Sequence, residues 1–489
     1  MSLIRQFAGQ SIIYGVGSIL ARVVNYLVIV VLLTYLLGDQ TEEFGTYAYF
    51  YAYAAVLITL FSFRLDTALF RYGNKDHDLN AAFDTALSLV IPLALALALI
   101  GTLLSQPLAV LLDYPDHPHY VQWICWIIAF DVINLIPFAK LRLTNKAMHF
   151  ALYKIINVVL LVSLTLFFLI VLPRSESLRS IIPEKKIVDW VFIANLMASA
   201  GLTLLLLPHL RSYRPRLDTA LSRKMLRYAF PLVIVGMANA FIQFFGVPLQ
   251  QFFLGADRLE NLADAGVYDF TRRVAGLFVM FTTAFNYAAE PFFFNNSSPE
   301  DRKALYGKIC RLFVLVGGLV ALGIFLGIDL LKYLADNAYW DSLHLLPILL
   351  MAYLLLGIYY NVSIWYKLSD KTTYGAVISV IGVMVTLIVS IGLLPVIGTA
   401  ASAWAALATY LVMVVLGYLL GQKHLPIDYP VKLICRDLLL IGTLMAAGQW
   451  IRAELGITTK YILYLLMLLL YAGYMWKSEE EEWRRVLRV

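Results

Sequence analysis

The stretch ALSLVIPLALALALIGTLL at residues 86–104 carries no charged side chain and is long enough to cross the hydrocarbon core of a bilayer as one helix. Backbone N–H and C=O groups find no water in lipid, so a run of this kind must satisfy them internally as a helix. Similar runs recur along the chain, separated by short segments that hold the Lys and Arg residues. This recurrence predicts an all-α polytopic membrane protein.

The composition also indicates that much of the surface faces lipid. Hydrophobic residues make up 61% of the 489 residues and charged residues 14%, which is more apolar surface than a water-facing fold can cover. The net charge of +6 comes from basic residues in short loops rather than on one amphipathic face, so we expect no nucleic-acid partner. Three separated cysteines without histidines at ligand spacing predict no metal site: Cys125, Cys310 and Cys435.

Reading the apolar runs against the charged segments predicts fourteen membrane-spanning helices. The first run follows Arg5 and is too long for a signal-peptide core, so we expect it to be retained. The predicted spans are 10–37, 44–70, 82–112, 120–141, 150–172, 187–210, 228–254, 265–294, 311–334, 345–365, 374–394, 400–420, 433–451 and 461–475.

Basic residues alternate from one loop to the next. Loops 211–227 and 302–308 are rich in Lys and Arg, whereas 39–43 and 257–264 are poor in them and acidic. Because short cytoplasmic loops hold the positive charge, the pattern predicts that both termini are cytoplasmic. Loop 173–186 departs from it, since four basic residues are mixed with acidic ones on the predicted outer side.

An internal repeat is visible in the second span of each half. The letters LG followed by FGTY in residues 37–47 recur as LG followed by AGVY in residues 254–268. Both copies enter from the same predicted side, which is typical of parallel repeats related by an axis along the membrane normal. We therefore expect two pseudo-symmetric six-helix lobes, 1–212 and 213–427, followed by two further helices and a cytoplasmic tail in 428–489.

Ionisable side chains within the first two predicted spans need a partner or a cavity, because charge is costly in the hydrocarbon region. Arg22 lies near the middle of the first span, with Asn25 almost on the same face. Arg64 and Asp66 are two residues apart in the second span and so point to different sides of a helix. Each of these two charges therefore needs a partner elsewhere.

Embedded cations outnumber embedded anions. Asp269 is spaced to pair with Arg272 or Arg273, at i+3 and i+4. The full set is Arg22, Arg64, Lys154, Arg272 and Arg273 against Asp66, Asp131, Asp269 and Glu290. The surplus predicts a cationic cavity between the lobes, where guanidinium groups hold an anionic headgroup bidentately. Internal salt bridges between helices are the alternative.

The site residues follow from this hypothesis. The predicted substrate-binding residues are Arg22, Asn25, Arg64, Arg272 and Arg273. Carboxylates in a medium of low dielectric are natural protonation switches, so the predicted ion-coupling residues are Asp66, Asp131 and Glu290. Amides in the seventh span would line the same cavity: Asn239, Gln243, Gln250 and Gln251. Pro248 favours a bend in that span, and plain helix-to-helix hydrogen bonding is the other reading of its amides.

Several strings resemble the O-antigen-type oligosaccharide-lipid flippases of the polysaccharide-biosynthesis family, within the multidrug/oligosaccharidyl-lipid/polysaccharide exporter superfamily. They are FAGQSIIYG at 7–15, LDTALFRY at 65–72, AAEPFFF at 288–294 and SIWYKLSDKT at 363–372. The resemblance implies two six-helix lobes around a central cavity, alternating access, and a polyprenyl-diphosphate-linked oligosaccharide moved from the inner to the outer leaflet for surface polysaccharide synthesis. Arg22, Asp66 and Glu290 match the family pattern, although Glu is commoner at position 66 and a charged residue is common near Gln250 and Gln251.

We therefore expect a flippase in a bacterial cytoplasmic membrane rather than an enzyme. The chain has no G-x-x-x-x-G-K-[ST] and no H-E-x-x-H motif, so ATP does not drive it directly and H⁺ or Na⁺ is the expected coupling ion. The expected partners are the lipid-linked glycan and membrane lipid. We expect the transporter to be a monomer, with glycan-assembly proteins as candidate partners. The alternatives are a multidrug organic-cation antiporter and a polytopic glycan polymerase or ligase.

Overall fold

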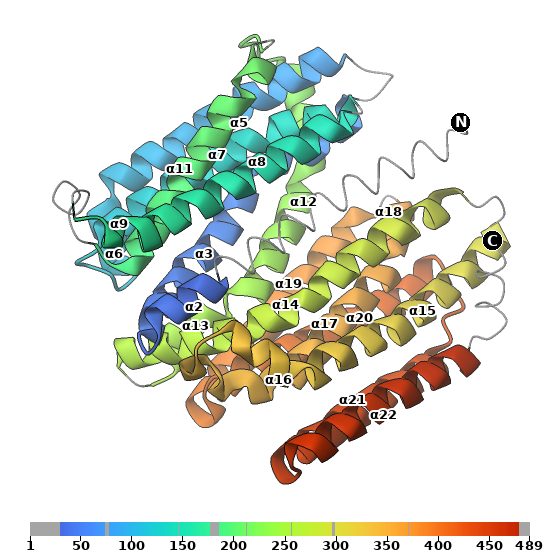
Figure 1. The fold of residues 1–489 in the computed structure, drawn as a ribbon. Helices are drawn as coiled ribbons and strands as arrows, with labels where there is room; N and C mark the ends of the chain where they lie inside the picture. The colour runs from blue at the N-terminus through green and yellow to red at the C-terminus, as the bar shows by residue number, and fades with distance from the viewer. Residues whose placement is uncertain are drawn as a thin grey trace. The chain divides into compact units, whose positions relative to one another are not determined.

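The structure is a computed structural model that describes residues 30–73, 78–144, 146–176, 185–211, 213–255, 257–295, 299–369 and 371–478. Side chains at 287–304, 367–368 and 457 lie outside this description. Helices make up nearly all of the described chain, and it contains no strand (Figure 1). The predicted all-α class is confirmed.

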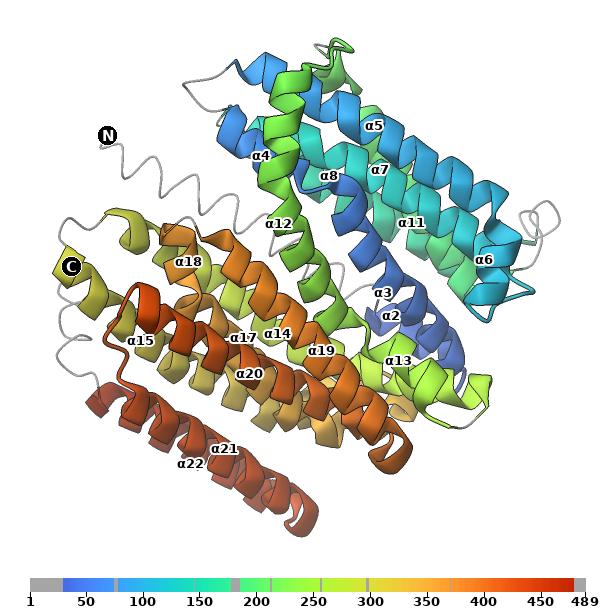
Figure 2. The ribbon, with the colours of Figure 1, turned by 180° about the vertical axis from the view of Figure 1, so that it is seen from behind.

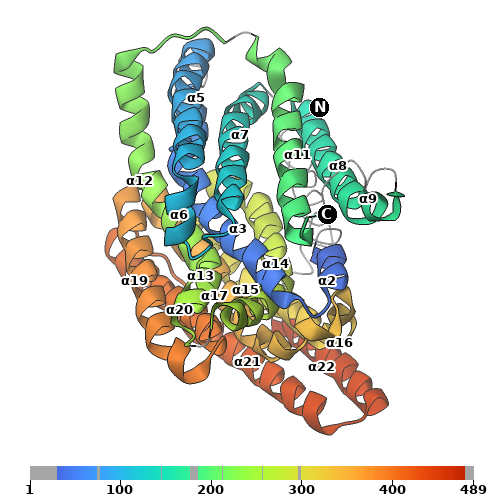
Figure 3. The same cartoon turned by 90° about the vertical axis from the view of Figure 1, so that its left-hand side faces the viewer.

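The chain divides into two compact units, of which the first holds residues 1–252 and 256–266. Within it α5, α7 and α11 run side by side, and α8 packs on α11 (Figure 3). Its helices are α2 Val31–Leu37, α3 Thr41–Ser62, α4 Leu65–Tyr72, α5 Leu79–Leu103, α6 Ser105–Leu111, α7 Pro118–Leu143, α8 Ala147–Leu166, a π-helical turn Phe167–Val171, α9 Leu172–Arg174, α11 Ile187–Leu210, α12 Thr219–Phe244 and α13 Gly246–Phe253.

The second unit holds residues 253–255 and 267–489. Within it α17 packs on α15 and α20, and α20 packs on α19. Its helices are α14 Arg258–Asn295, which begins in the first unit, α15 Pro299–Leu326, α16 Ile328–Leu331, three 3₁₀ turns at Lys332–Leu334, Asn337–Tyr339 and Asp341–Leu345, α17 Leu346–Val362, α18 Ile364–Leu368, α19 Thr372–Ile397, α20 Ala400–His424, α21 Val431–Glu454 and α22 Ile457–Ser478.

The compact units and the predicted lobes divide the chain at different places. The repeat places the boundary after residue 212, whereas α12 packs on α3 and α4 and is grouped with the first unit (Figure 2). The predicted lobes follow the sequence repeat, whereas the compact units follow contacts between residues in the structure. The predicted lobe boundaries therefore remain a prediction.

Eleven helices in the described residues are long and apolar enough to cross a membrane. They coincide with eleven of the predicted spans. Helices α14 and α21 occupy the positions of two more and are not in this set. The first predicted span lies outside the described residues, so the count of fourteen and the cytoplasmic termini remain predictions.

The outer surface is apolar enough to face lipid. Leu103 on α5, Val396 on α19 and Leu439 on α21 are 80%, 74% and 70% exposed. Exposed side chains of this kind gain nothing from water, and a bilayer provides the solvent that accommodates them. Together with the eleven long apolar helices, this surface identifies a multi-pass membrane protein.

The two glycines of the sequence repeat meet each other in the first unit. A Cβ atom on Gly266 of α14 would clash with the carbonyl oxygen of Thr41 and would lie 2.8 Å from the amide nitrogen of Gly45. A Cβ on Gly45 of α3 would clash with the carbonyl oxygen of Leu262. Because backbone atoms cannot rotate away as a side chain can, only glycine fits at either position.

The C-terminal helices α21 and α22 pack on α15 through a buried carboxylate. Asp437 of α21 is fully buried and lies 3.1 Å from Arg436 and 3.5 Å from Arg311 of α15. Tyr474 of α22 donates a hydrogen bond to the same carboxylate. One anion therefore ties three helices together.

A second carboxylate repeats this arrangement. Asp329 of α16 lies 2.7 Å from Lys460 of α22, 3.8 Å from Arg452 of α21 and 3.9 Å from Lys332. Asp329 is 5% exposed, so the interaction takes place largely out of water. Two ionic clusters thus attach α21 and α22 to the other helices of the second unit.

The glycine contact leads to a stability prediction. We expect Gly266→Ala to lower the free energy of unfolding in detergent by about 1–3 kcal/mol, because the added methyl group overpacks a backbone contact. Gly276→Ala on the same helix is the matched control, since its Cβ would meet no atom within 4 Å. Equal stability of the two variants, measured by denaturant unfolding, would contradict the close approach.

Candidate functional site

The second predicted span is broken into two helices at Phe63 and Arg64. Both residues have left-handed backbone conformations, with φ of 45° and 50°. The amide of Arg64 donates to the Ser62 hydroxyl at 3.3 Å, and the Arg64 carbonyl accepts from Thr67 and Ala68 at the start of α4. Two successive non-glycine residues in this region are strained, typically by about 1–3 kcal/mol each. The break places Arg64 at the N-terminus of α4.

The Arg64 side chain packs against α12. A Cβ on Gly236 would lie 3.2 Å from the Arg64 Nε atom and 2.6 Å from a Thr59 methyl group. The Nε atom is buried, and no described residue accepts a hydrogen bond from it. A buried donor without an acceptor loses about 1–3 kcal/mol, which a bound anion would recover.

Asp66 lies in the first turn of α4, where a carboxylate is favoured by the helix dipole. Its Oδ1 atom is buried and has no hydrogen-bond partner among the described residues. As the spacing predicts, Arg64 and Asp66 do not pair with each other, and neither makes an ion pair within the described chain. Each side chain therefore has one buried polar atom, Arg64 Nε or Asp66 Oδ1, to which no described residue makes a hydrogen bond.

Asp269 on α14 holds both neighbouring arginines. It is fully buried and accepts a hydrogen bond from Arg272 Nε at 2.8 Å, while Arg273 Nε bonds its other oxygen. The predicted i+3 and i+4 pairing is confirmed, and it forms on both sides at once. One carboxylate thus bonds two guanidinium groups.

Asp131 on α7 belongs to a polar network inside the first unit. Ser199 of α11 donates to its Oδ1 atom at 2.7 Å, and Asn134 donates to the Ser199 carbonyl at 3.3 Å. Asn195 continues the network to the Tyr51 hydroxyl on α3. The carboxylate therefore connects helices as well as being a candidate for ion coupling.

The seventh predicted span bends close to its proline. α12 ends at Phe244, and α13 begins at Gly246, so the bend predicted from Pro248 is confirmed. Gln250 and Gln251 on α13 are 0% and 5% exposed. Both amide atoms of Gln251 lack hydrogen-bond partners in the described part of the chain.

The remaining predicted residues are less fully placed. Asn239 and Gln243 are half-buried on α12, on the N-terminal side of the bend. Arg22 and Asn25 lie outside the described residues, as does the side chain of Glu290. Assembly of the predicted cationic cavity therefore remains a prediction.

Sequence reasoning missed the break at Phe63 and Arg64. Residues 60–70 read LFSFRLDTALF and contain neither Gly nor Pro, the usual signals of an interruption. The polar residues Ser62 and Arg64, on either side of Phe63, were the available sign.

A family model and solved structures match the chain. The model described as polysaccharide biosynthesis protein matches residues 8–297. A structure of the lipid II flippase MurJ in an inward closed conformation aligns with a TM-score of 0.64 and 13% identity, covering 96% of this chain and 99% of that one. No curated protein sequence matches.

Multidrug transporters show the same fold. An inward-facing multidrug resistance MATE family transporter of the MOP superfamily aligns with a TM-score of 0.60 and 14% identity, covering 87% of this chain and 95% of that one. An outward-facing structure of a transporter of the same description aligns with a TM-score of 0.59 and 14% identity, covering 86% and 95%. At these identities the structural matches establish the fold.

The Asp269 cluster leads to a second prediction. We expect Asp269→Asn to cost about 3–5 kcal/mol of unfolding free energy, because it removes the buried carboxylate that both partly buried guanidinium groups bond. Asp264→Asn is the control on the same helix, where the side chain is exposed. A triple variant, Asp269→Leu with Arg272→Met and Arg273→Met, should recover most of the lost stability. If a detergent unfolding assay shows no recovery, the stability lost in Asp269→Asn has a cause other than the charges of these three side chains.

Proposed function

The chain belongs to the polysaccharide biosynthesis protein family of the MOP superfamily, and on that premise we propose that it moves a polyprenyl-diphosphate-linked oligosaccharide from the inner to the outer leaflet. Membrane transport by this superfamily needs a site that binds cargo within the bilayer and is exposed to each side in turn. We propose that the chain does so as a monomer in a bacterial cytoplasmic membrane, supplying glycan for surface polysaccharide synthesis.

The observation that carries the proposal is the buried Nε atom of Arg64, which has no acceptor among the described residues. A guanidinium group keeps its charge at any physiological pH and fits two phosphate oxygens at once. A diphosphate offers those oxygens and the compensating negative charge. An arginine that the described helices leave unpaired on a membrane-spanning segment is therefore better explained by an anionic cargo than by helix packing.

The organic-cation antiporter is the competing proposal, and the superfamily fold is compatible with it. A cationic cargo would be attracted by unpaired carboxylates and repelled by unpaired arginines. Asp66 has one oxygen without a partner among the described residues, so it could serve such a cargo only if Arg64 were neutralised by another residue. The glycolipid proposal instead uses both groups, with Arg64 on the diphosphate and Asp66 on the coupling ion.

The test is translocation of a polyprenyl-diphosphate-linked oligosaccharide in reconstituted vesicles. We expect Arg64→Ala to lower the initial rate at least tenfold, and Arg64→Lys to restore part of it, because an ammonium keeps the charge and loses the fork. Arg71→Ala is the matched control, since Arg71 is an exposed cation on the same helix and stacks on Tyr228.

Two outcomes would count against the proposal. Well-folded Arg64→Ala protein that flips at the wild-type rate would remove Arg64 from the binding site. Vesicles that exchange an organic cation for protons and leave the glycolipid in place would establish the antiporter instead.

Ion coupling leads to a further prediction. We propose that Asp66, rather than Asp131, takes the coupling H⁺ or Na⁺, because Ser199 already donates to Asp131 whereas Asp66 Oδ1 has no partner among the described residues. Asp66→Asn should retain translocation without its response to an imposed proton or sodium gradient, and Asp66→Glu should keep that response. Asp131→Asn, which can still accept from Ser199, is the control. Gradient dependence lost only in the Asp131 variant would reverse the assignment.

A further inference from the structure

The ionic cluster at Asp329 holds more cations than its one carboxylate balances. The carboxylate oxygens lie 2.7 Å from Lys460 Nζ, 3.8 Å from Arg452 Nε and 3.9 Å from Lys332 Nζ. None of these three cations pairs with a second carboxylate in the part of the chain that the structure describes. Three positive charges against one negative charge leave two positive charges in the cluster.

The two more distant cations keep their donor groups. At 3.8 and 3.9 Å from Asp329, Arg452 and Lys332 are beyond hydrogen-bond distance, and neither side chain makes another hydrogen bond to a described residue. Lys332 Nζ lies over the Trp340 ring at 4.6 Å, a contact that uses its charge but accepts no proton. The side chains of Arg452 and Lys332 are 24% and 22% exposed, so an anion can reach them.

The cluster forms where several helices of the second unit end together. Arg452 is in the last turn of α21, Lys460 is in the first turn of α22, and Asp329 and Lys332 follow the end of α15. Figure 1 shows α16 and the turn between α21 and α22 at the same end of this unit. Because α15 and α22 are apolar enough to cross a membrane, this common end lies near the level of lipid headgroups.

Exposed aromatic side chains adjoin the cations along the chain. Tyr333, Trp450 and Tyr461 are 60%, 63% and 42% exposed, and each is one or two residues from a cation of the cluster. Leu330, next to Asp329, is 73% exposed. Tyr and Trp are enriched where acyl chains meet headgroups. The surplus positive charge therefore lies beside lipid, at the level where phospholipid phosphates lie.

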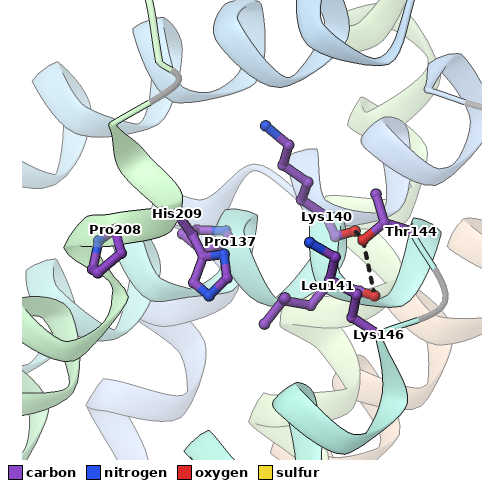
Figure 4. A pocket seen from close by; sticks show the side chains of 7 residues that line it. All are labelled: Pro137, Lys140, Leu141, Thr144, Lys146, Pro208 and His209. Carbon is purple, nitrogen blue, oxygen red and sulfur yellow. Dashed lines mark hydrogen bonds between the residues drawn. The ribbon is translucent and has the colours of Figure 1, made fainter.

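A basic pocket at the ends of α7 and α11 in the first unit differs from this cluster (Figure 4). There Lys140 Nζ lies over the Phe83 ring at 3.8 Å, and the Thr144 hydroxyl donates to the Lys140 carbonyl at 2.9 Å. His209 forms a 3.2 Å hydrogen bond with Tyr153. The polar groups of that pocket thus have partners within the chain, and we place no ligand in it.

We propose that the Asp329 cluster binds the phosphate of an anionic phospholipid through Arg452 and Lys332, while Lys460 keeps its contact with Asp329. The guanidinium fork of Arg452 fits two phosphate oxygens, and the Lys332 ammonium adds charge. A zwitterionic headgroup would bring another cation toward the surplus, so an anionic headgroup is favoured. The proposal does not depend on the identity of the transported cargo.

The test measures the thermal unfolding midpoint of the purified, delipidated full chain in detergent as dioctanoyl phosphatidylglycerol is added. We expect a saturable rise in the midpoint that dioctanoyl phosphatidylcholine does not produce. Arg452→Gln with Lys332→Gln should weaken the apparent affinity about tenfold or more, equivalent to at least about 1.4 kcal/mol. Lys432→Gln is the matched control, since it removes an exposed cation from the first turn of α21, at the other end of that helix.

The double variant keeps the shortest ion pair of the cluster, between Asp329 and Lys460, which favours a folded protein. If it nevertheless unfolds, Lys332→Gln alone should still weaken the affinity for phosphatidylglycerol. Variants that lower the midpoint but leave the lipid-dependent rise unchanged would show that the cations serve only as internal ion pairs, and would overturn the proposal.

A parallel titration with inorganic phosphate at constant ionic strength separates the two sources of phosphate. A response to phosphatidylglycerol without a response to inorganic phosphate supports the lipid site. An equal response to inorganic phosphate would overturn it in favour of a soluble anion, and equal midpoint shifts with both lipids would overturn the preference for an anionic headgroup.

Discussion

Buried carboxylates that each hold more than one cation organise the second unit. Asp269 takes two arginines, Asp437 takes Arg311 and Arg436, and Asp329 takes Lys460 together with more distant cations. A charge in a medium of low dielectric is tolerated only beside its counter-charge, so these contacts determine which helices stay together. Helix-to-helix attachment in this unit therefore depends on a few ions as much as on apolar packing.

Arg64 in the first unit departs from this rule. Its Nε atom is buried without an acceptor among the described residues, and the backbone there is strained. Strained backbone and an unsatisfied donor at one residue are costs that folding alone does not explain, and they occur together where a protein binds a ligand. The Arg64 side chain, which no described residue bonds, differs in this respect from the arginines of α14, which bond Asp269.

Local spacing allowed part of this structure to be predicted. The apolar runs predict helices because lipid permits no other backbone arrangement, Asp269 pairs at i+3 and i+4 because the helix repeat places it there, and Pro248 marks the bend before α13. Contacts between distant segments could not be predicted in the same way. Asp329 and Lys460 are far apart in sequence, and no local pattern relates them.

The repeated glycines fall between these two cases. Their recurrence is visible in the sequence, but the contact between Gly45 and Gly266 is a property of the folded chain. The break at Arg64 is the opposite case. The structure shows it plainly, but residues 60–70 contain no Gly or Pro that would predict it. A backbone conformation imposed by tertiary contacts leaves little trace in local sequence.

The break also solves a problem of length. Residues Thr41–Tyr72 as one straight helix of 32 residues would extend about 48 Å at 1.5 Å per residue, well beyond a hydrocarbon core of about 30 Å. α3 alone, with 22 residues and about 33 Å, already matches that thickness. The turn at Phe63 and Arg64 therefore relieves hydrophobic mismatch. It leaves the guanidinium group at the point where α3 has already provided the length that one span needs.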